Sequence, residues 1–338
     1  MPNNQIIVLD NRPQGEPSTS NFKLCSADTP ALQEGQVLVR NHYLSLDPYM
    51  RGRMNDSKSY AAPQALGQVM VGGTVGEVIE SRNPKFQVAD IVVGRGGWQH
   101  FTVIEPQSMG EYRKVDPSRF SMSHFLGAVG MPGVTAWYGL VKIIAPKAGE
   151  TVTVSAASGA VGSAYGALAK ARGCRVVGIA GGKEKCDYVV NELGFDDCVD
   201  YKQHADAVSL AKALKVACPQ GIDGHFENVG GMVLDAVMMR MNAFSRMAVC
   251  GMIAGYNGNP LPMSNPSAIL INRMKIEGFI VGEHPEVWPE ALQELGDMVA
   301  SGTLRPRETV AQGLAAAPEA FLGLLKGKNF GKQLVKLL

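Results

Sequence analysis

The sequence predicts an α/β protein in which a doubly wound, Rossmann-type parallel sheet is joined to a smaller β-rich domain with a partly closed barrel. Three patterns support this class. Thr151–Gly162 reads TVTVSAASGAVG, a β-branched strand that runs into a glycine-rich turn. Strand and helix patterns then alternate regularly to about residue 300. Residues 1 to about 120 instead show short strands separated by glycine turns.

The β-rich part is predicted from period-2 alternation of apolar and polar residues. Its expected strands are 35–43, 69–79, 86–94 and 98–104, and the chain's end adds helix 318–326 and strand 333–337. Gly72, Gly73 and Gly76 indicate a bend in the second strand. Between two strands, Leu44–Met54 carries two arginines, a tyrosine and a proline. This segment is either a surface loop with a short helix or a loop that faces a substrate.

A helix that begins at Met131 marks the second domain, and we place the boundary near residue 125. The expected strands are 151–155, 175–180, 198–201, 223–227, 246–250 and 275–281, which would form a six-stranded parallel sheet. The expected helices are 160–171, 183–193, 205–218, 232–241 and 285–300, the second with Gly194 as its C-cap.

The turn after the first of these strands has the glycine pattern of a dinucleotide-binding site, with Ala157 in place of the first glycine. Gly159 would let the backbone approach a pyrophosphate, and Gly162 would let the helix pack against the strand. Ala160 and Val161 begin the helix, whose free N–H groups would point at the phosphates. The strand 175–180, one helix further on, completes a βαβ unit.

Composition excludes several classes of partner. The chain has 338 residues, 46% hydrophobic and 19% charged, which is typical of a globular protein with a large core, and two domains are expected. Its net charge of +1 gives no reason to expect nucleic acid or an anionic membrane surface as a partner. No run approaches 18 apolar residues, and the first ten residues lack the features of a signal peptide. We expect a cytoplasmic protein.

No metal site is expected. The six cysteines do not form C-x-x-C pairs and have no closely spaced histidine, so reduced, mostly buried thiols are predicted. The six histidines fall in no ligand motif. They are His42, His100, His124, His204, His225 and His284.

The end of the second strand distinguishes the two nicotinamide cofactors. NAD-binding folds place an acidic residue there, about 20 residues past the glycines, to bind the ribose 2′-hydroxyl. Here the strand tip is Gly181-Gly182, followed by Lys183 and Lys185, and the only acid, Glu184, lies past the tip. An uncapped strand end beside lysines suits a 2′-phosphate, so NADPH is favoured over NADH. The alternative is that both lysines are solvated helix-start residues.

These motifs, with several others, resemble the medium-chain dehydrogenase/reductase superfamily, and within it the zinc-independent double-bond reductases, in particular the bacterial curcumin-reductase branch. The matching segments are 44–54, 127–136 (GAVGMPGVTA), 156–162, 227–231 (ENVGG), 250–257 and 324–332, in the family's order along the whole chain. The zinc enzymes of the superfamily carry Gly-His-Glu where this chain has Leu66-Gly67-Gln68-Val69-Met70.

The resemblance implies a GroES-like catalytic domain that binds substrate, residues 1–125 and 300–338, and a dinucleotide-binding domain, residues 126–299. It also implies a set of cofactor-binding residues: Gly159, Ala160, Val161, Gly162, Gly181, Lys185, Tyr201, Asn228, Cys250, Gly251, Tyr256, Phe279, Ile280, Val281 and Asn329. A homodimer formed through the dinucleotide-binding domain is a further expectation from the family.

The activity expected from this resemblance is NADPH-dependent reduction of a conjugated C=C bond in an α,β-unsaturated ketone or aldehyde. A hydride would add to the β-carbon, and a hydrogen-bond donor would stabilise the enolate oxygen without a metal. Tyr256 is the first candidate for this catalytic donor, because it follows the carboxyl end of a parallel strand. Tyr49, Tyr60 and Met131 are candidate substrate contacts. Each could instead be an ordinary packing residue.

Two other functions remain open at this point. The same fold and cofactor could serve an NADPH:quinone oxidoreductase, against which the segment Leu44–Met54 argues by resemblance. A non-catalytic NADPH-binding protein of the crystallin type is an alternative of another class. The loop Asn257–Met263, rich in glycine and proline, could close over a substrate, but its sequence does not indicate the substrate's size.

Overall fold

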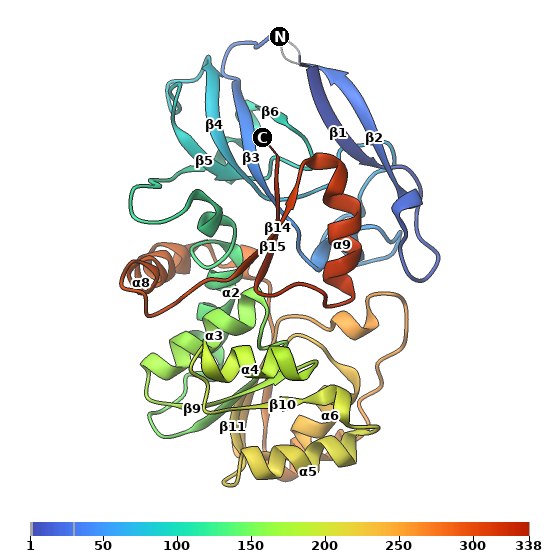
Figure 1. Ribbon diagram of the computed structural model, residues 1–338, viewed down its shortest axis with the longest axis vertical. Helices are drawn as coiled ribbons and strands as arrows, with labels where there is room; N and C mark the ends of the chain where they lie inside the picture. Colours follow the sequence, from blue (N-terminus) through green and yellow to red (C-terminus); the bar gives the residue numbers. More distant parts are fainter. Residues whose placement is uncertain (1–2, 30, 338) are drawn as a thin grey trace. The chain divides into compact units, whose positions relative to one another are not determined.

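The computed structural model describes residues 3–29 and 31–337. The described chain forms two compact units, one from the N-terminal part to Leu126 together with Glu308 onward, and the other from Gly127 to Arg307. Figure 1 shows that the strands β14 and β15 and the helix α9, which come last in the sequence, belong to the N-terminal unit. We describe each unit separately.

The unit 127–307 contains the expected six-stranded parallel sheet, which confirms the predicted fold class. Its strands are β8 (Thr151–Ser155), β9 (Arg175–Ala180), β10 (Asp197–Asp200), β11 (Ile222–Glu227), β12 (Met241–Val249) and β13 (Lys275–Gly278). They pair in the order β10-β9-β8-β11-β12-β13, and every pair is parallel. The strand order therefore reverses between β8 and β11, where parallel sheets bind ligands.

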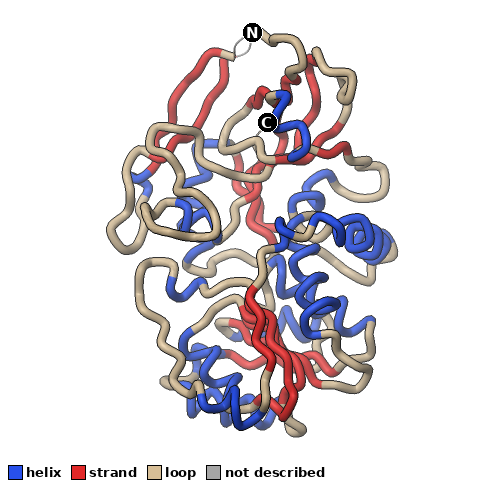
Figure 2. The backbone as a smooth tube through the Cα atoms, turned by 180° about the vertical axis from the view of Figure 1, so that it is seen from behind, coloured by secondary structure: helices blue, strands red, loops and turns tan. Residues whose placement is uncertain are grey.

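Helices cover both faces of this sheet (Figures 1 and 2). They are α2 (Met131–Tyr138), α3 (Ala160–Ala171), α4 (Lys183–Asn191), α5 (Ala207–Ala217), α6 (Gly231–Met238), α7 (Ser267–Asn272) and α8 (Trp288–Ala300). Val177 and Ile179 of β9 are buried with Leu210 and Leu214 of α5. Gly178, between them on β9, faces Val189 of α4 instead. Successive residues of β9 therefore pack against helices on opposite faces of the sheet, because side chains alternate between the two faces along a strand.

Some elements end earlier than expected. The strand predicted to reach Val281 ends at Gly278, because its neighbour β12 ends at Val249, the residue that pairs with Gly278. Phe279 donates one more hydrogen bond to the Val249 carbonyl, and the chain then turns. The helix predicted to Leu193 ends at Asn191, with Glu192 as its C-cap, and Gly194 follows with φ +72°.

The other unit contains a sheet of order β14-β15-β3-β4-β5-β7, with β6 also paired to β3, and a separate antiparallel pair β1-β2. The strands are β1 (Asn3–Leu9), β2 (Phe22–Asp28), β3 (Val37–Ser45), β4 (Thr74–Ser81), β5 (Ile91–Gly94), β6 (Phe101–Ile104), β7 (Arg113–Lys114), β14 (Glu308–Gln312) and β15 (Lys332–Lys336). Two helices, α1 (Tyr49–Arg53) and α9 (Ala317–Leu325), complete it.

The core of this unit is aromatic and brings distant segments together. Trp98, fully buried, stacks on Phe22 with ring centroids 5.3 Å apart, and Phe321 of α9 packs edge-on against Trp98 at 5.7 Å. The strands predicted at 69–79 and 86–94 are shorter than expected. The second is broken before Asp90, because Ala89 has φ +74° in a turn.

Candidate functional site

The glycine-rich turn between β8 and α3 forms the first wall of the candidate site. Gly159 is the N-cap of α3 and offers no side-chain cap, so the helix N-terminus is available to an anion. A Cβ on Gly162 would lie 2.5 Å from the Ala156 carbonyl oxygen, so only glycine permits this close approach. Ala156 itself has φ +52°, a conformation that few residues with a side chain adopt. The turn fits a pyrophosphate.

The tip of β9 lies against the end of β10. A Cβ on Gly181 would be 2.8 Å from the Tyr201 ring and 2.9 Å from Cε of Lys202, so these two side chains cover the strand tip. The pKa of Lys185, in the first turn of α4, is lowered by burial and by the positive charge of Lys202. A phosphate group would relieve this repulsion, and the tip therefore fits the 2′-phosphate of NADPH.

Lys183, the other lysine named from the sequence, lies on the exposed side of α4, whereas Lys185 is partly buried. The Lys183 side chain is 85% exposed and forms an ion pair with Asp187 one turn along α4, with Nζ and Oδ2 2.6 Å apart. The sequence pattern did not single out Lys202, which follows Tyr201 after β10. Only the parallel pairing of β10 with β9 brings this lysine to the tip.

Asn228 lies at the point where the strand order reverses. Its backbone N–H donates to Ser155 Oγ at 2.7 Å, and its side-chain Nδ2 donates to the Ser155 carbonyl at 2.8 Å. Ser155 in turn donates to Oε1 of Glu227 at 2.7 Å. Asn228 is therefore held by two hydrogen bonds to the last residue of β8, directly before the glycine turn.

The segment after β12 lies beside Asn228. Cys250 N–H and Gly251 N–H donate to the Glu227 carbonyl at 3.0 and 3.2 Å. A Cβ on Gly251 would be 3.0 Å from the Tyr256 hydroxyl oxygen, which places that hydroxyl over the Gly251 backbone. Burial raises the pKa of the Cys250 thiol to about 12, with a smaller contribution from the Glu227 charge, so this thiol stays protonated at neutral pH.

The remaining predicted residues of this unit lie after β13 and at the start of α2. Phe279 packs against Tyr138 with ring centroids 5.2 Å apart, Ile280 is half-buried and Val281 is buried. Met131 is the first residue of α2. Its carbonyl accepts a hydrogen bond from Thr135 Oγ1 at 2.7 Å, and its sulfur lies 3.6 Å from the same hydroxyl.

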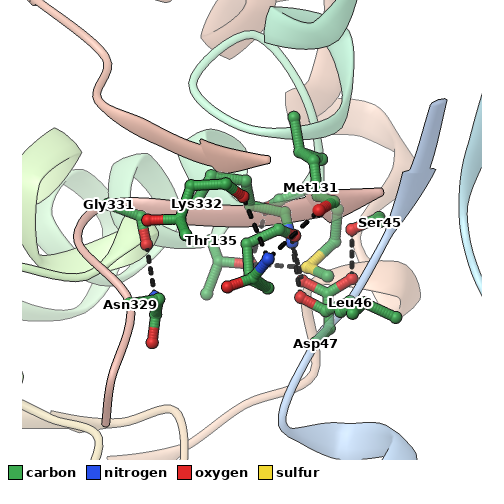
Figure 3. Close-up of polar contacts among 11 residues, drawn as sticks. Ser45, Leu46, Asp47, Met131, Thr135, Asn329, Gly331 and Lys332 are labelled. Carbon is green, nitrogen blue, oxygen red and sulfur yellow. Dashed lines mark hydrogen bonds and ion pairs between the residues drawn. The ribbon is translucent and has the colours of Figure 1, made fainter. Parts of the chain in front are cut away.

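Tyr49, Tyr60 and Asn329 belong to the β-rich unit. Tyr49 begins α1, and burial and the nearby Asp47 charge raise its pKa. Tyr60 is 59% exposed. Asn329 is buried, and its Nδ2 donates to the Gly331 carbonyl at 2.8 Å (Figure 3).

The buried lysine Lys332 fixes the backbone just before Tyr49 and just after Asn329. Lys332 Nζ donates to the Leu46 carbonyl at 2.6 Å, to Asp47 Oδ1 at 3.0 Å and to the Gln333 carbonyl at 3.0 Å (Figure 3). Asp47 also accepts a hydrogen bond from Ser45 Oγ. All three donors of the ammonium group are used, which ties the segment before α1 to β15. Sequence reasoning did not identify this pair.

The site thus defines a nicotinamide-dinucleotide-binding protein with a β-rich partner domain. Two family models match the chain: one described as the N-terminal domain of oxidoreductase, over residues 5–111, and one described as zinc-binding dehydrogenase, over residues 160–297. Among the residues that the structure describes, no group of three or more His, Cys, Asp or Glu is arranged to hold a metal ion.

Individual relatives align over nearly the whole chain. The NADPH-dependent curcumin reductase of Escherichia coli (strain K12) is 45% identical, covering 99% of this chain and 97% of the relative. The 2-alkenal reductase (NADP(+)-dependent) of Nicotiana tabacum is 41% identical, with 98% and 97% covered, and prostaglandin reductase 1 of Rattus norvegicus is 41% identical, with 96% of each covered. The crystal structure of CurA in complex with NADPH from Vibrio vulnificus superposes with a TM-score of 0.92 at 45% identity, covering 99% of each chain.

The chain belongs to the medium-chain dehydrogenase/reductase superfamily, in the double-bond reductase branch that contains these curcumin, alkenal and prostaglandin reductases. The family resemblance drawn from the sequence motifs is confirmed.

Proposed function

We propose that this chain is an NADPH-dependent reductase of conjugated C=C bonds in α,β-unsaturated ketones and aldehydes. The single observation that carries the proposal is the strand tip at Gly181, where β9 itself ends without an acidic residue and Lys185 and Lys202 lie next to the glycine turn. Asp200, at the end of β10, accepts the Gly182 N–H at 2.7 Å. The names of the relatives support the reaction class, since they include an NADPH-dependent curcumin reductase, an NADP(+)-dependent 2-alkenal reductase and a prostaglandin reductase.

NADPH, when bound, supplies a hydride for the β-carbon of the substrate. The chain's own residues do the rest. The N-terminus of α3 binds the pyrophosphate, and Lys185 and Lys202 bind the 2′-phosphate. The Tyr256 hydroxyl donates a hydrogen bond to the carbonyl oxygen as it becomes an enolate, and this lowers the barrier because charge develops at that atom. A proton from this hydroxyl or from water then reaches the α-carbon and completes the reduction. Tyr49, Tyr60 and Met131 contact the substrate.

The reaction class is tested by following NADPH oxidation with an alkenal, an enone, curcumin and a quinone. We expect turnover of at least one conjugated carbonyl compound, with saturation of the C=C bond in the product. Turnover of the quinone alone would favour an NADPH:quinone oxidoreductase. Turnover of no member of the panel would favour a non-catalytic NADPH-binding protein.

The role of Tyr256 is tested with Tyr256→Phe. We expect kcat for an enone to fall tenfold or more, on the order of one charge-assisted hydrogen bond lost in the transition state. The Kd for NADPH should stay within about threefold of the original, because the ring is retained. Unchanged kcat would show that another group, the cofactor ribose hydroxyl or water, supplies the proton.

The cofactor preference is tested with Lys185→Ala and Lys202→Ala. Each should raise KM for NADPH about tenfold and leave KM for NADH nearly unchanged, since each removes a cation that binds the 2′-phosphate. Lys183→Ala is the matched control, because Lys183 pairs with Asp187 on the outside of the same helix. If the unaltered enzyme used NADH as well as NADPH, the assignment of this tip would be wrong.

We also propose a homodimer and a cytoplasmic location. Leu270 and Ile271 on α7 are 80% and 63% exposed, and Phe244 is 68% exposed, in the unit where β13 is an edge strand. An apolar surface beside an open sheet edge is typical of a protein–protein interface. Light scattering should give a molecular mass twice that of the chain, and Leu270→Glu should reduce the measured mass to that of a single chain. No helix in the described part of the chain is long and apolar enough to span a membrane.

A further inference from the structure

Four polar side chains are completely buried at the carboxyl ends of β8 and β11. Thr153, Ser155, His225 and Glu227 each have no exposed surface. They lie on one face of the sheet, because His225 pairs with Thr153 and the other two follow at i+2 on their strands. A central parallel strand is normally apolar on both faces. Such a buried polar group is costly unless every member is hydrogen-bonded.

These four side chains form one continuous hydrogen-bonded chain. Thr153 Oγ1 lies 2.7 Å from His225 Nδ1, and His225 Nε2 lies 2.9 Å from Glu227 Oε2. Ser155 Oγ donates to Glu227 Oε1 at 2.7 Å. Since the Glu227 carboxylate accepts, His225 donates this hydrogen bond from Nε2.

Both carboxylate oxygens of Glu227 accept hydrogen bonds. Besides Ser155, Oε1 accepts the backbone N–H groups of Val229 at 2.5 Å and Gly230 at 3.0 Å. Burial opposes its ionisation, but His225 and these two N–H groups outweigh burial and hold the pKa of Glu227 below its usual range. A charged carboxylate therefore shapes the turn that begins α6.

The same residue aligns two neighbouring loops. Its backbone carbonyl accepts from Cys250 and Gly251, while Ser155, which its side chain holds, accepts from Asn228. The Tyr256 hydroxyl lies over Gly251. Asn228 is thus positioned through Ser155 by the Glu227 carboxylate, and Cys250 and Gly251 are positioned by the Glu227 backbone carbonyl, at the point where the strand order reverses.

We propose that Glu227, oriented by His225 and Thr153, is a positioning residue that holds Asn228 and the Cys250–Tyr256 segment in the arrangement that binds NADPH. This rests on the proposed function, because it concerns the same cofactor site. Stability alone does not account for the network, since well-packed apolar residues stabilise a protein interior as well as or better than buried ions do.

The test is cofactor affinity measured without substrate, by calorimetry or by quenching of tryptophan fluorescence. Glu227→Gln keeps the shape and removes the charge. We expect it to raise the Kd for NADPH tenfold or more and to lower kcat at saturating NADPH. Glu227→Asp, which keeps the charge, should recover part of the affinity.

Glu150→Gln is the matched control. Glu150 is also paired, with Arg246 Nη2 at 2.5 Å, but it precedes β8 at the opposite end of the sheet. Its substitution should leave the Kd for NADPH within twofold. A Glu227→Gln protein that binds NADPH within threefold of the original, whatever its thermal stability, would overturn the proposal.

Ser155→Ala provides a second route if Glu227→Gln does not fold. It removes the hydroxyl between Asn228 and Glu227 and keeps the His225–Glu227 pair. We expect at least a fivefold weaker Kd, and normal binding by this folded variant would also overturn the proposal. Because binding is measured without substrate, an enzyme that reduces no member of the enone panel would refute the proposed function and leave this comparison intact.

Discussion

Both units of the molecule contain buried charged groups close in sequence to predicted site residues, but they assemble these groups differently. In the unit 127–307, His225 and Glu227 are two residues apart on one strand, and their partners lie on the neighbouring strand β8. In the other unit, Lys332 and Asp47 are 285 residues apart in sequence. The first cluster follows from strand alternation within a repeated βα pattern. The second exists only because the end of the chain returns to pair with β3.

The two buried clusters are expected to contribute differently to the stability of the protein and to the binding of the cofactor. Lys332 donates to the Leu46 carbonyl and the Asp47 carboxylate, which lie about 285 residues away in sequence, and to the carbonyl of its neighbour Gln333. Glu227 is anchored largely by its own strand and the turn that follows. We therefore expect the lysine pair to contribute more to the stability of its unit than the glutamate network does, and we expect the main effect of the glutamate network to be on the shape of the binding site.

Among the substitutions that test this comparison, Lys332→Met is expected to have the largest effect on the free energy of unfolding. It leaves Asp47 buried without its cation, and such a loss costs about 3–5 kcal/mol of the free energy of unfolding. Urea denaturation measures this. The double variant Lys332→Met/Asp47→Leu removes both charges and should recover at least half of the loss. A single variant that costs less than about 1 kcal/mol would show that the pair does not anchor β15.

In the unit 127–307, Gly162→Ala is expected to have a smaller effect on the free energy of unfolding. The new Cβ would lie 2.5 Å from the Ala156 carbonyl, so the turn must shift, at a cost of about 1–3 kcal/mol. The Kd for NADPH should rise with it. Gly110→Ala is the control in the other unit, because a Cβ there meets no atom within 4 Å. Equal stability and affinity for the two variants would contradict the packing argument.

The pH dependence of stability tests the charge on Glu227. Its folded pKa lies below the usual 4.5, so the ionised carboxylate stabilises the fold above that pH, and this stabilisation is lost as pH falls through the folded pKa. The original protein should exceed Glu227→Gln in Tm at pH 7, and the gap should narrow by about 2–4 °C toward pH 3. A gap that is constant with pH would mean that Glu227 is neutral in the folded protein.

The smallest effect concerns thiol reactivity. A hydrogen bond from Cys198 lowers the pKa of Cys186, whereas burial raises the pKa of Cys250 to about 12. Because the thiolate is the reactive form, iodoacetamide at pH 8 should modify Cys186 several times faster than Cys250. Peptide mass spectrometry over time measures both rates, with Cys186→Ser to assign the fast phase. Both cysteines are partly exposed, so a faster reaction at Cys250 would contradict the expected difference in pKa.

Strand and helix positions in the parallel unit were largely predictable from the sequence. The strand 151–155 and the helix 160–171 have the bounds that their patterns predicted. The β-rich unit was predicted less completely: the strands β1, β2, β7 and β14 were missed, and each is stabilised by pairing with a strand that is separated from it by a longer segment of the chain. Propensity is a weak guide where pairing decides the structure.

The sequence by itself determined the family, the glycine turn and the preference for a 2′-phosphate, because each depends on residues that are neighbours along the chain. The tertiary structure decided which groups surround these features. Lys202 reaches the tip of β9 through parallel pairing, and Glu227 meets Ser155 where the strand order reverses. Lys332 reaches Asp47 through the return of the C-terminal strand. Such contacts depend on which strands pair, and pairing is set by burial over the whole chain rather than by any one segment.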